Sequence, residues 1–436
     1  MPVFGITDGA RRVSLAFLGN GGTAGRNLLN PRMGMGSMGI MDEPQHTSMI
    51  SFGYCTNVYP GITLADVLAN IERFGRDTRE VTQGGKDNCP IGLWLAESAV
   101  NELSDPKCIE QLQQVLSQFG LTAQTFNGFP QQDFHQPVVK HRVYQPNWTD
   151  TSRLAFTCKL ADILAQLLEE GQTGTISTLP IAWGQPRLSI SEIEFAARQL
   201  LAFAECADRI YATTGRTIRL CLEPEPGCML QVSGDVVSFL NDYVLRHCGN
   251  ETQVRRHLAI CHDVCHAAVM FEAQADAIAR YLNAGWDIAK VQISSALAVD
   301  FSNRSQAEVS ALVTHLARFA EPRYLHQTCV NGNELFEDLP IAIERAPRVG
   351  TWRTHFHVPI FARELPGGLA TTQADIGRCV AALLPNADQI HWEIETYAWQ
   401  VLPDPPTDDQ LGPAIRQEIT WLQQQFSYFT LRKSNS

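Results

Sequence analysis

The feature that most constrains the fold is a regular alternation of short β-prone apolar runs with longer amphipathic segments, repeated about every 40 residues from Ser51 onward. This alternation is typical of parallel strands joined by crossover helices. The predicted strands are 51–56, 91–95, 121–126, 174–179, 217–223, 258–263, 290–294, 353–358 and 389–395. Eight or nine such units predict an α/β fold, a (β/α)8 TIM barrel, rather than two doubly wound domains.

Capping signals mark where the predicted helices begin. Thr63 and Asp66 have the spacing of a capping box ahead of an apolar helix face. The same spacing recurs at 191–194 and 305–308, each ahead of a long amphipathic segment. These signals support helices between the predicted strands.

Two connections are too long for plain loops, so we expect insertions after strands 3 and 7. Residues 127–150 follow the third strand, and residues 322–350 follow the seventh and contain a predicted hairpin near 324–330. Several polar and aromatic side chains near the expected barrel mouth are candidates for the wall of a ligand site, unless they only pack on the barrel. Those selected as substrate-binding residues are Asn57, His135, Trp148 and Glu225.

The first 48 residues differ from the rest of the chain. Six of the eight methionines lie within residues 1–49, and the segment shows no sustained helix or strand period. We expect residues 1–48 to be a flexible extension and residues 49–436 to form the barrel domain.

Charge and cysteine usage exclude several classes of protein. The net charge of −12 disfavours binding to nucleic acid or anionic membrane. No stretch approaches the roughly 18 apolar residues needed to cross a bilayer. The 12 cysteines are scattered without a CxxC pair, which is typical of a reduced cytoplasmic protein.

Polar side chains gather at the ends of the later predicted strands. Because chemistry in a barrel lies at the carboxyl ends of its strands, we expect these side chains to converge on one mouth. In chain order they are Glu223, Asp263, His266, Gln292, His355, His357, Glu393 and Glu395.

Carboxylates, an amide and imidazoles at one mouth can bind a divalent cation. An oxygen-rich set favours Mn²⁺, Mg²⁺ or Co²⁺, whereas a histidine in the set favours Zn²⁺. Such a site supports proton abstraction next to a carbonyl. Each acid taken alone is also compatible with a helix cap or a surface position. Cys261 and Cys265 flank Asp263, and we interpret both as buried thiols.

Several strings resemble a known superfamily. LEPEPG, Asp263-Val-Cys-His266, VQISS and the terminal IET are similar to the xylose isomerase-like barrels. Together with FGYCTNVYPG, HDVCH, THFHVPIF and ETYAW, over about residues 50–405, they resemble the EboE family, described as metabolite traffic proteins.

The resemblance implies roles for individual residues. Glu223, Asp263, Gln292 and Glu395 match the four metal-ligand positions of the superfamily, and His266 matches a histidine that borders the substrate. About 100 residues separate the last two ligands, more than a minimal isomerase has. The strand predicted in this gap carries two histidines that can join or replace a ligand or contact the substrate, namely His355 and His357.

The leading hypothesis is therefore a divalent-metal-dependent isomerase or epimerase acting on a small hydroxycarbonyl metabolite. Glu223 and Glu395 would exchange the proton while His266 and His357 steady substrate oxygens. The resemblance adds a cytoplasmic role in processing and exporting a secondary metabolite, alongside other enzymes of the pathway. The alternatives are a non-catalytic metabolite-binding or escort protein and a metal-dependent hydrolase.

Overall fold

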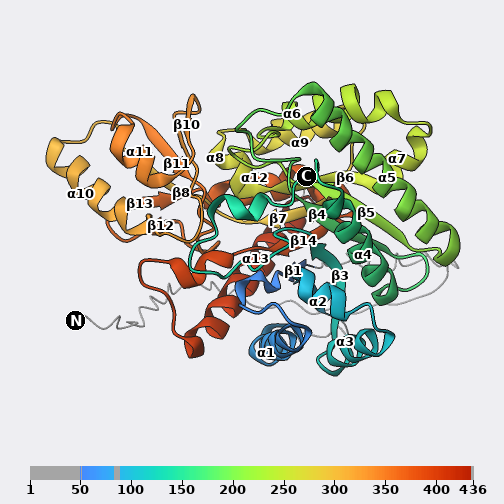
Figure 1. The fold of residues 1–436 in the computed structure, drawn as a ribbon. Coiled ribbons are helices and arrows are strands. Elements are labelled where there is room, and N and C mark those ends of the chain that lie inside the picture. The colour runs from blue at the N-terminus through green and yellow to red at the C-terminus, as the bar shows by residue number, and fades with distance from the viewer. Residues whose placement is uncertain (1–49, 51, 83–88, 434–436) are drawn as a thin grey trace, which may run out of the picture. The chain divides into compact units, whose positions relative to one another are not determined.

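The structure is a computed structural model that describes residues 50, 52–82 and 89–433, so the predicted extension 1–48 lies outside the described residues. The described residues contain one sheet of eight strands, coloured from blue to red along the chain in Figure 1. In chain order the strands are β1 (Phe52–Tyr54), β2 (Cys89–Trp94), β3 (Leu121–Asn127), β4 (Thr173–Thr178), β5 (Thr217–Leu222), β6 (Leu258–Asp263), β7 (Ile288–Ile293) and β14 (His391–Ile394).

The eight strands form a closed parallel barrel. Every pairing in the order β1-β14-β7-β6-β5-β4-β3-β2 is parallel. A further parallel bridge between Cys55 and Gly92 joins the two ends of this order. The predicted (β/α)8 barrel is thereby confirmed, with its insertions after the third and seventh strands.

Helices connect the strands and surround them in Figure 1. Their apolar faces join the strands in one large core. They are α1 (Leu64–Thr82), α2 (Glu97–Glu102), α3 (Pro106–Gln118), α4 (Thr151–Leu167), α5 (Ile190–Thr214), α6 (Ser233–Phe239), α7 (Glu251–His257), α8 (Val264–Val269), α9 (Gln274–Asn283), α12 (Gln373–Leu383) and α13 (Asp408–Lys433).

The capping boxes expected for α1 and the helix after Ser305 are present. The prediction of a capping box at 191–194 is wrong, because α5 begins at Ile190, two residues earlier than this box would place it. Ser189 has extended backbone angles and caps the helix with Glu192, which leaves Ser191 inside the first turn.

The barrel interior is polar, whereas the outer faces of its strands are apolar. On β7, Val291 and Ile293 pack in the main core under the helices. Lys290 and Gln292 alternate with them and donate hydrogen bonds to the Asn127 side chain, on β3, across the barrel. The interior is thus held by hydrogen bonds and charge.

A fully buried ion pair is the centre of this interior. Lys290 Nζ lies 2.8 Å from Glu393 Oε2, and neither side chain is exposed. Asn127 donates a second hydrogen bond to the same carboxylate oxygen, at 3.0 Å. The carboxylate occupies the space beside Gly92, where an added Cβ would lie only 1.3 Å from Glu393 Oε1. Gly92 is therefore required for this close approach.

The insertion after β7 builds a second sheet, drawn in orange in Figure 1, with a core of its own. All of its pairings are antiparallel, in the order β10-β9-β11-β8-β13-β12. Its elements are β8 (Leu297–Asp300), α10 (Gln306–Leu316), β9 (Thr328–Val330), β10 (Glu334–Phe336), α11 (Leu339–Arg345), β11 (Thr351–Thr354), β12 (Glu364–Leu365) and β13 (Leu369–Thr371).

This sheet corrects two expectations. The strand predicted at 353–358 is shorter and belongs to the second sheet, because β11 pairs antiparallel with β8 and β9 and ends at Thr354. The hairpin predicted near 324–330 lies slightly later, since β9 and β10 pair over 328–336. Within the described residues, no helix is both long and apolar enough to cross a membrane.

We predict that Lys290→Met lowers the free energy of unfolding by about 3–5 kcal/mol, because it leaves the Glu393 carboxylate buried without its counter-charge. The double variant Lys290→Met/Glu393→Gln should recover much of this loss. Chemical denaturation of both variants measures the difference. Equal destabilisation in the single and double variants would contradict the role given to the ion pair.

Candidate metal centre

Three carboxylates meet where barrel strands end. Glu223 directly follows β5, Asp263 is the last residue of β6, and Glu395 directly follows β14. One oxygen from each lies within 4.8 Å of the others, and all three side chains are buried. The parallel arrangement of the strands brings these distant residues to one mouth.

Buried atoms without a hydrogen-bond partner converge on this cluster. Among the described residues, no partner reaches Glu223 Oε2, Asp263 Oδ2 or His357 Nε2. His357 Nε2 lies 3.9 Å from Asp263 Oδ2. Because buried polar atoms are nearly always paired, such a group calls for a common partner. Two carboxylate oxygens and an imidazole nitrogen are ligand atoms that a divalent cation accepts.

The remaining atoms of these carboxylates are held in place. Asp263 Oδ1 accepts hydrogen bonds from Ser294 Oγ and from the His266 backbone N–H, both at 2.8 Å. Glu395 Oε1 accepts one from Asn57 Nδ2, also at 2.8 Å. Such outer contacts orient metal ligands and leave the opposite oxygen free.

Burial and mutual repulsion shift the acidity of the three carboxyls. Burial raises the pKa of Glu223 to about 8, with the charge of Asp263 adding to the effect and His266 opposing it. Burial and the charge of Glu223 raise the pKa of Glu395 well above its usual value. Burial alone would also raise the pKa of Asp263, but His266 and His357 hold it below its usual value. Asp263 is therefore the carboxyl that keeps its charge most readily.

Two histidines approach the carboxylates from different elements. His266 lies on α8, one turn after Asp263, with Nδ1 3.7 Å from Glu223 Oε1. His357 comes from the insertion that carries the second sheet, and its Nδ1 donates to the backbone carbonyl of Glu395 at 2.7 Å. The sequence predicted His355 and His357 on one face of a strand; both instead lie beyond the end of β11. His357 still reaches Asp263 and Glu395, whereas His355 lies beside His266 and Glu225.

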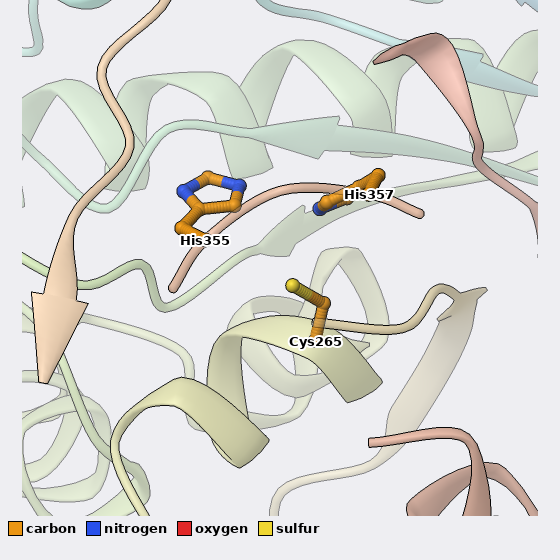
Figure 2. A group of neighbouring side chains, drawn as sticks. All are labelled: Cys265, His355 and His357. Carbon is orange, nitrogen blue, oxygen red and sulfur yellow. The ribbon is translucent and has the colours of Figure 1, made fainter. Parts of the chain in front are cut away.

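Figure 2 shows Cys265 with its sulfur directed toward the space between His355 and His357. Burial, reinforced by the charge of Asp263, raises the pKa of this thiol well above its usual value. Burial and the neighbouring His266 lower the pKa of His355 far below its usual value. Without a cation, Cys265 is thus a neutral thiol and His355 a neutral imidazole.

Gln292 is engaged inside the barrel. Its Nε2 donates to Asn127 Oδ1 at 2.8 Å, and its Oε1 accepts from the Cys261 thiol at 3.4 Å. Its amide is therefore already hydrogen-bonded, in contrast to the unpaired atoms of the carboxylate cluster. The expected role of Gln292 as a ligand stays a prediction.

The four residues expected to contact substrate lie in different places. The structure brings Asn57 to Glu395, as described above, and brings Glu225 to the histidines, where it lies 3.8 Å from His355 Nδ1. The Trp148 side chain is fully buried, and its Nε1 donates a hydrogen bond to Thr178 Oγ1. It therefore belongs to the main hydrophobic core.

His135 is likewise not part of the cluster. Its ring packs against the rings of Trp94 and Phe134, at centroid distances of 5.8 and 5.4 Å. Burial and the charge of Arg323 lower its pKa to about 4. This histidine is consequently neutral at physiological pH.

Residues missed from the sequence hold the site together. Gln327 Oε1 accepts from His355 Nδ1 at 2.7 Å, and Gln327 Nε2 reaches Glu225 at 3.3 Å. Ser294 fixes Asp263. The sequence offered a clue only for Ser294, which lies in the string VQISS that resembles the barrel superfamily. Gln327 lies in an insertion without a recognisable sequence pattern.

A cavity of about 450 Å³ lies at the loops after β4 and β5, and its lining does not include Glu223, Asp263 or Glu395. Trp183, Arg187, Cys228 and Met229 are among its lining residues. The thiol of Cys228, one of its lining residues, contacts Glu225 Oε2 at 3.9 Å, and Glu225 in turn lies beside His266 and His355. The volume suits a small organic molecule.

No family model and no curated protein matches the chain, so the EboE resemblance stays a prediction. Solved barrels resemble it in structure. A xylose isomerase-like TIM barrel protein from Mycobacterium smegmatis in complex with magnesium is 11% identical, with a TM-score of 0.48 over 88% of this chain and 98% of the other. A D-tagatose 3-epimerase-like protein is 11% identical, with a TM-score of 0.43 over 86% of this chain and 98% of the other. A probable 3-DHS dehydratase from Bacillus anthracis is 14% identical, with a TM-score of 0.44 over 85% of this chain and 98% of the other.

We predict that divalent-metal binding tightens as the pH rises toward 8. Glu223, with a pKa of about 8, must lose its proton to bind a cation, so the apparent Kd should fall about tenfold per pH unit for each proton displaced. Titration calorimetry in buffers of different ionisation enthalpy measures both the Kd and the released protons. A pH-independent Kd without proton release would contradict this assignment.

The same shift has a consequence for stability. The folded protein binds the Glu223 proton more tightly than the unfolded chain does, because burial raises the pKa of this carboxyl. The stability from this group is fully present below the unfolded pKa, near 4.5, and is lost as the pH rises through 8. We therefore expect the Tm of metal-free protein to fall over this interval and added cation to restore it. A Tm of metal-free protein that stays constant or rises over this pH interval would contradict the raised pKa of Glu223.

Proposed function

We propose that this protein is a divalent-metal-dependent isomerase or epimerase that moves a proton next to the carbonyl of a small polyhydroxylated metabolite. The observation that carries the proposal is the convergence of buried, unpaired atoms from Glu223, Asp263 and His357 beside Glu395. A solely structural cluster would be expected to satisfy these atoms internally.

In this proposal the cation is held by Glu223, Asp263, Glu395 and His357. When bound, a divalent cation polarises carbonyl and hydroxyl oxygens of a substrate and so acidifies the neighbouring C–H bond. Asn57 and Ser294 keep the carboxylates in orientation through the hydrogen bonds described above.

Glu223 and Glu395 are the proposed proton carriers. Burial raises the pKa of both carboxyls in the metal-free protein, and a carboxylate with a raised pKa is a stronger general base than an ordinary one. One carboxylate takes the proton from the carbon next to the carbonyl, and the other carboxyl returns a proton to the resulting enediolate. His266, beside Glu223, steadies a substrate oxygen.

The cavity beside Trp183 is the proposed entry for the metabolite. Its size and its mixed polar and apolar lining suit a small hydroxycarbonyl compound. We also propose, from the sequence resemblance alone, that the reaction serves cytoplasmic processing and export of a secondary metabolite, alongside other enzymes of that pathway.

A second candidate function, metal-assisted hydrolysis, is favoured by one observation. Three imidazoles, those of His266, His355 and His357, approach the carboxylates, and histidine-rich sites commonly bind zinc with an activated water. A hydrolase would cleave an ester, amide or phosphate bond without exchanging a carbon-bound proton. This difference separates the two functions experimentally.

The test is solvent deuterium exchange. Purified protein with Mn²⁺, Mg²⁺, Co²⁺ or Zn²⁺ is incubated in D2O with a panel of ketoses and hydroxycarbonyl compounds, and proton NMR follows deuterium at the carbon next to the carbonyl. We predict exchange by the wild type and a loss of about 10²–10⁴-fold in Glu395→Gln, since a general base is removed.

Asp208→Asn serves as the matched control. Asp208 pairs with Arg256 and His257 on another part of the barrel, and the substitution removes the same charge without touching the cluster. It should retain wild-type exchange. Metal-loaded wild type that exchanges no proton on any compound would contradict the proposal, and would leave an escort protein; cleavage of test esters or phosphates would indicate the hydrolase.

A further inference from the structure

A second group of side chains lies beside the carboxylate cluster. Glu225, His266 and His355 each offer a ligand atom within 4.8 Å of the others, and all three are buried. The Nε2 atoms of the two histidines face each other at 3.1 Å. This close approach of two ring nitrogens needs a physical cause.

Hydrogen bonds on the far side of each ring determine its neutral tautomer. His266 Nδ1 lies 2.9 Å from the Pro224 carbonyl, which can only accept, so Nδ1 carries the proton. His355 Nδ1 lies 2.7 Å from Gln327 Oε1, which also accepts. Gln327 Nε2 faces Tyr144 Oη and Glu225 Oε1, and this contact supports the orientation of the amide.

Both Nε2 atoms consequently present lone pairs to each other in the neutral rings. Two lone pairs at this distance repel unless a proton or a cation lies between them. Burial opposes protonation of His266, but the charges of Asp263, Glu225 and Glu223 outweigh it and raise the pKa of this ring, so a proton on His266 Nε2 can fill this place in the metal-free protein. Metal-bound histidines commonly donate the other ring N–H to a carbonyl or carboxylate, which is the pattern around both rings. His357 shows the same pattern: its Nδ1 donates a hydrogen bond to the Glu395 backbone carbonyl, and its Nε2 has no hydrogen-bond partner among the described residues.

Glu225 has one oxygen to offer. Its Oε1 accepts hydrogen bonds from Tyr144 Oη at 2.6 Å and from Gln327 Nε2 at 3.3 Å. The other oxygen, Oε2, is contacted by the Cys228 thiol at 3.9 Å, which is a weak interaction. The carboxylate is thus oriented by one oxygen and available through the other.

We propose that Glu225, His266 and His355 form a second cation position, so that the barrel mouth holds two divalent cations. This inference rests on the metal centre of the proposed function and adds a second position to it; His266 is then a ligand of the second cation in place of the direct substrate contact proposed above. Two imidazoles and one carboxylate form a ligand set typical of zinc, with an open coordination position left for water or substrate. The second sheet supplies His355 and Gln327, so the position is incomplete without that insertion.

The test is metal stoichiometry in the full-length protein. After equilibration with Zn²⁺ and removal of free metal, elemental analysis should give two equivalents for the wild type. His355→Ala should retain one equivalent, and Glu225→Gln provides an independent variant if His355→Ala does not fold. His315→Ala removes a histidine from α10, away from the cluster, and should retain two.

A spectroscopic readout tests whether the two positions are adjacent. Protein loaded with Mn²⁺ should give the electron paramagnetic resonance signal of a coupled pair, and His355→Ala should give that of an isolated ion. Gln327→Leu should weaken the second equivalent about 10–100-fold, because Gln327 orients His355 without binding metal itself.

The outcomes separate this inference from the proposed function. One equivalent in the wild type, unchanged in His355→Ala, would overturn the second position, and deuterium exchange would still test the function. In that case NMR of labelled histidines should find a proton on Nε2 of His266 or His355, bridging the rings. No bound metal in the wild type would overturn both proposals.

Discussion

The buried carboxylates at the barrel mouth are the constraint on which the rest of the structure depends. Glu223, Asp263 and Glu395 lie close together where water does not screen them, and ionised carboxylates repel strongly in such surroundings. Burial raises the pKa of the two glutamates, and this repulsion adds to the effect. The charge of Lys290 opposes these shifts only in part, because Lys290 pairs with Glu393 deeper in the barrel. A cation at the mouth would supply the missing positive charge.

The second sheet completes this mouth. It follows β7 and is followed by α12, the barrel helix that precedes β14. Backbone hydrogen bonds from Val358 to Ser295 and from Thr372 to Ala296 attach it there. The same insertion places His357 beside Asp263 and Glu395, and His355 beside Glu225. In this account the insertion is part of the site, and it also excludes water from the charges that the cation must balance.

Much of the barrel was predictable from the sequence, because each strand has a local apolar signal. The end of that signal also shows which polar residue lies at the carboxyl end of the strand. Glu223, Asp263 and Glu395 therefore lie where their strands end. The position of 353–358 was not predictable: a short apolar run does not reveal whether its partners are parallel or antiparallel. Gln327 and Lys290 were missed for a related reason. Their roles depend on partners 28 and 103 residues away, His355 and Glu393, which no local pattern specifies.

The most direct measurement is anomalous X-ray diffraction from crystals equilibrated with Mn²⁺ or Zn²⁺, recorded on both sides of the absorption edge of the metal. The account predicts an anomalous peak at the metal edge within coordination distance of Glu223 Oε2, Asp263 Oδ2 and His357 Nε2. A well-ordered mouth without a peak, in protein whose three carboxyls are paired by water or by each other, would contradict it.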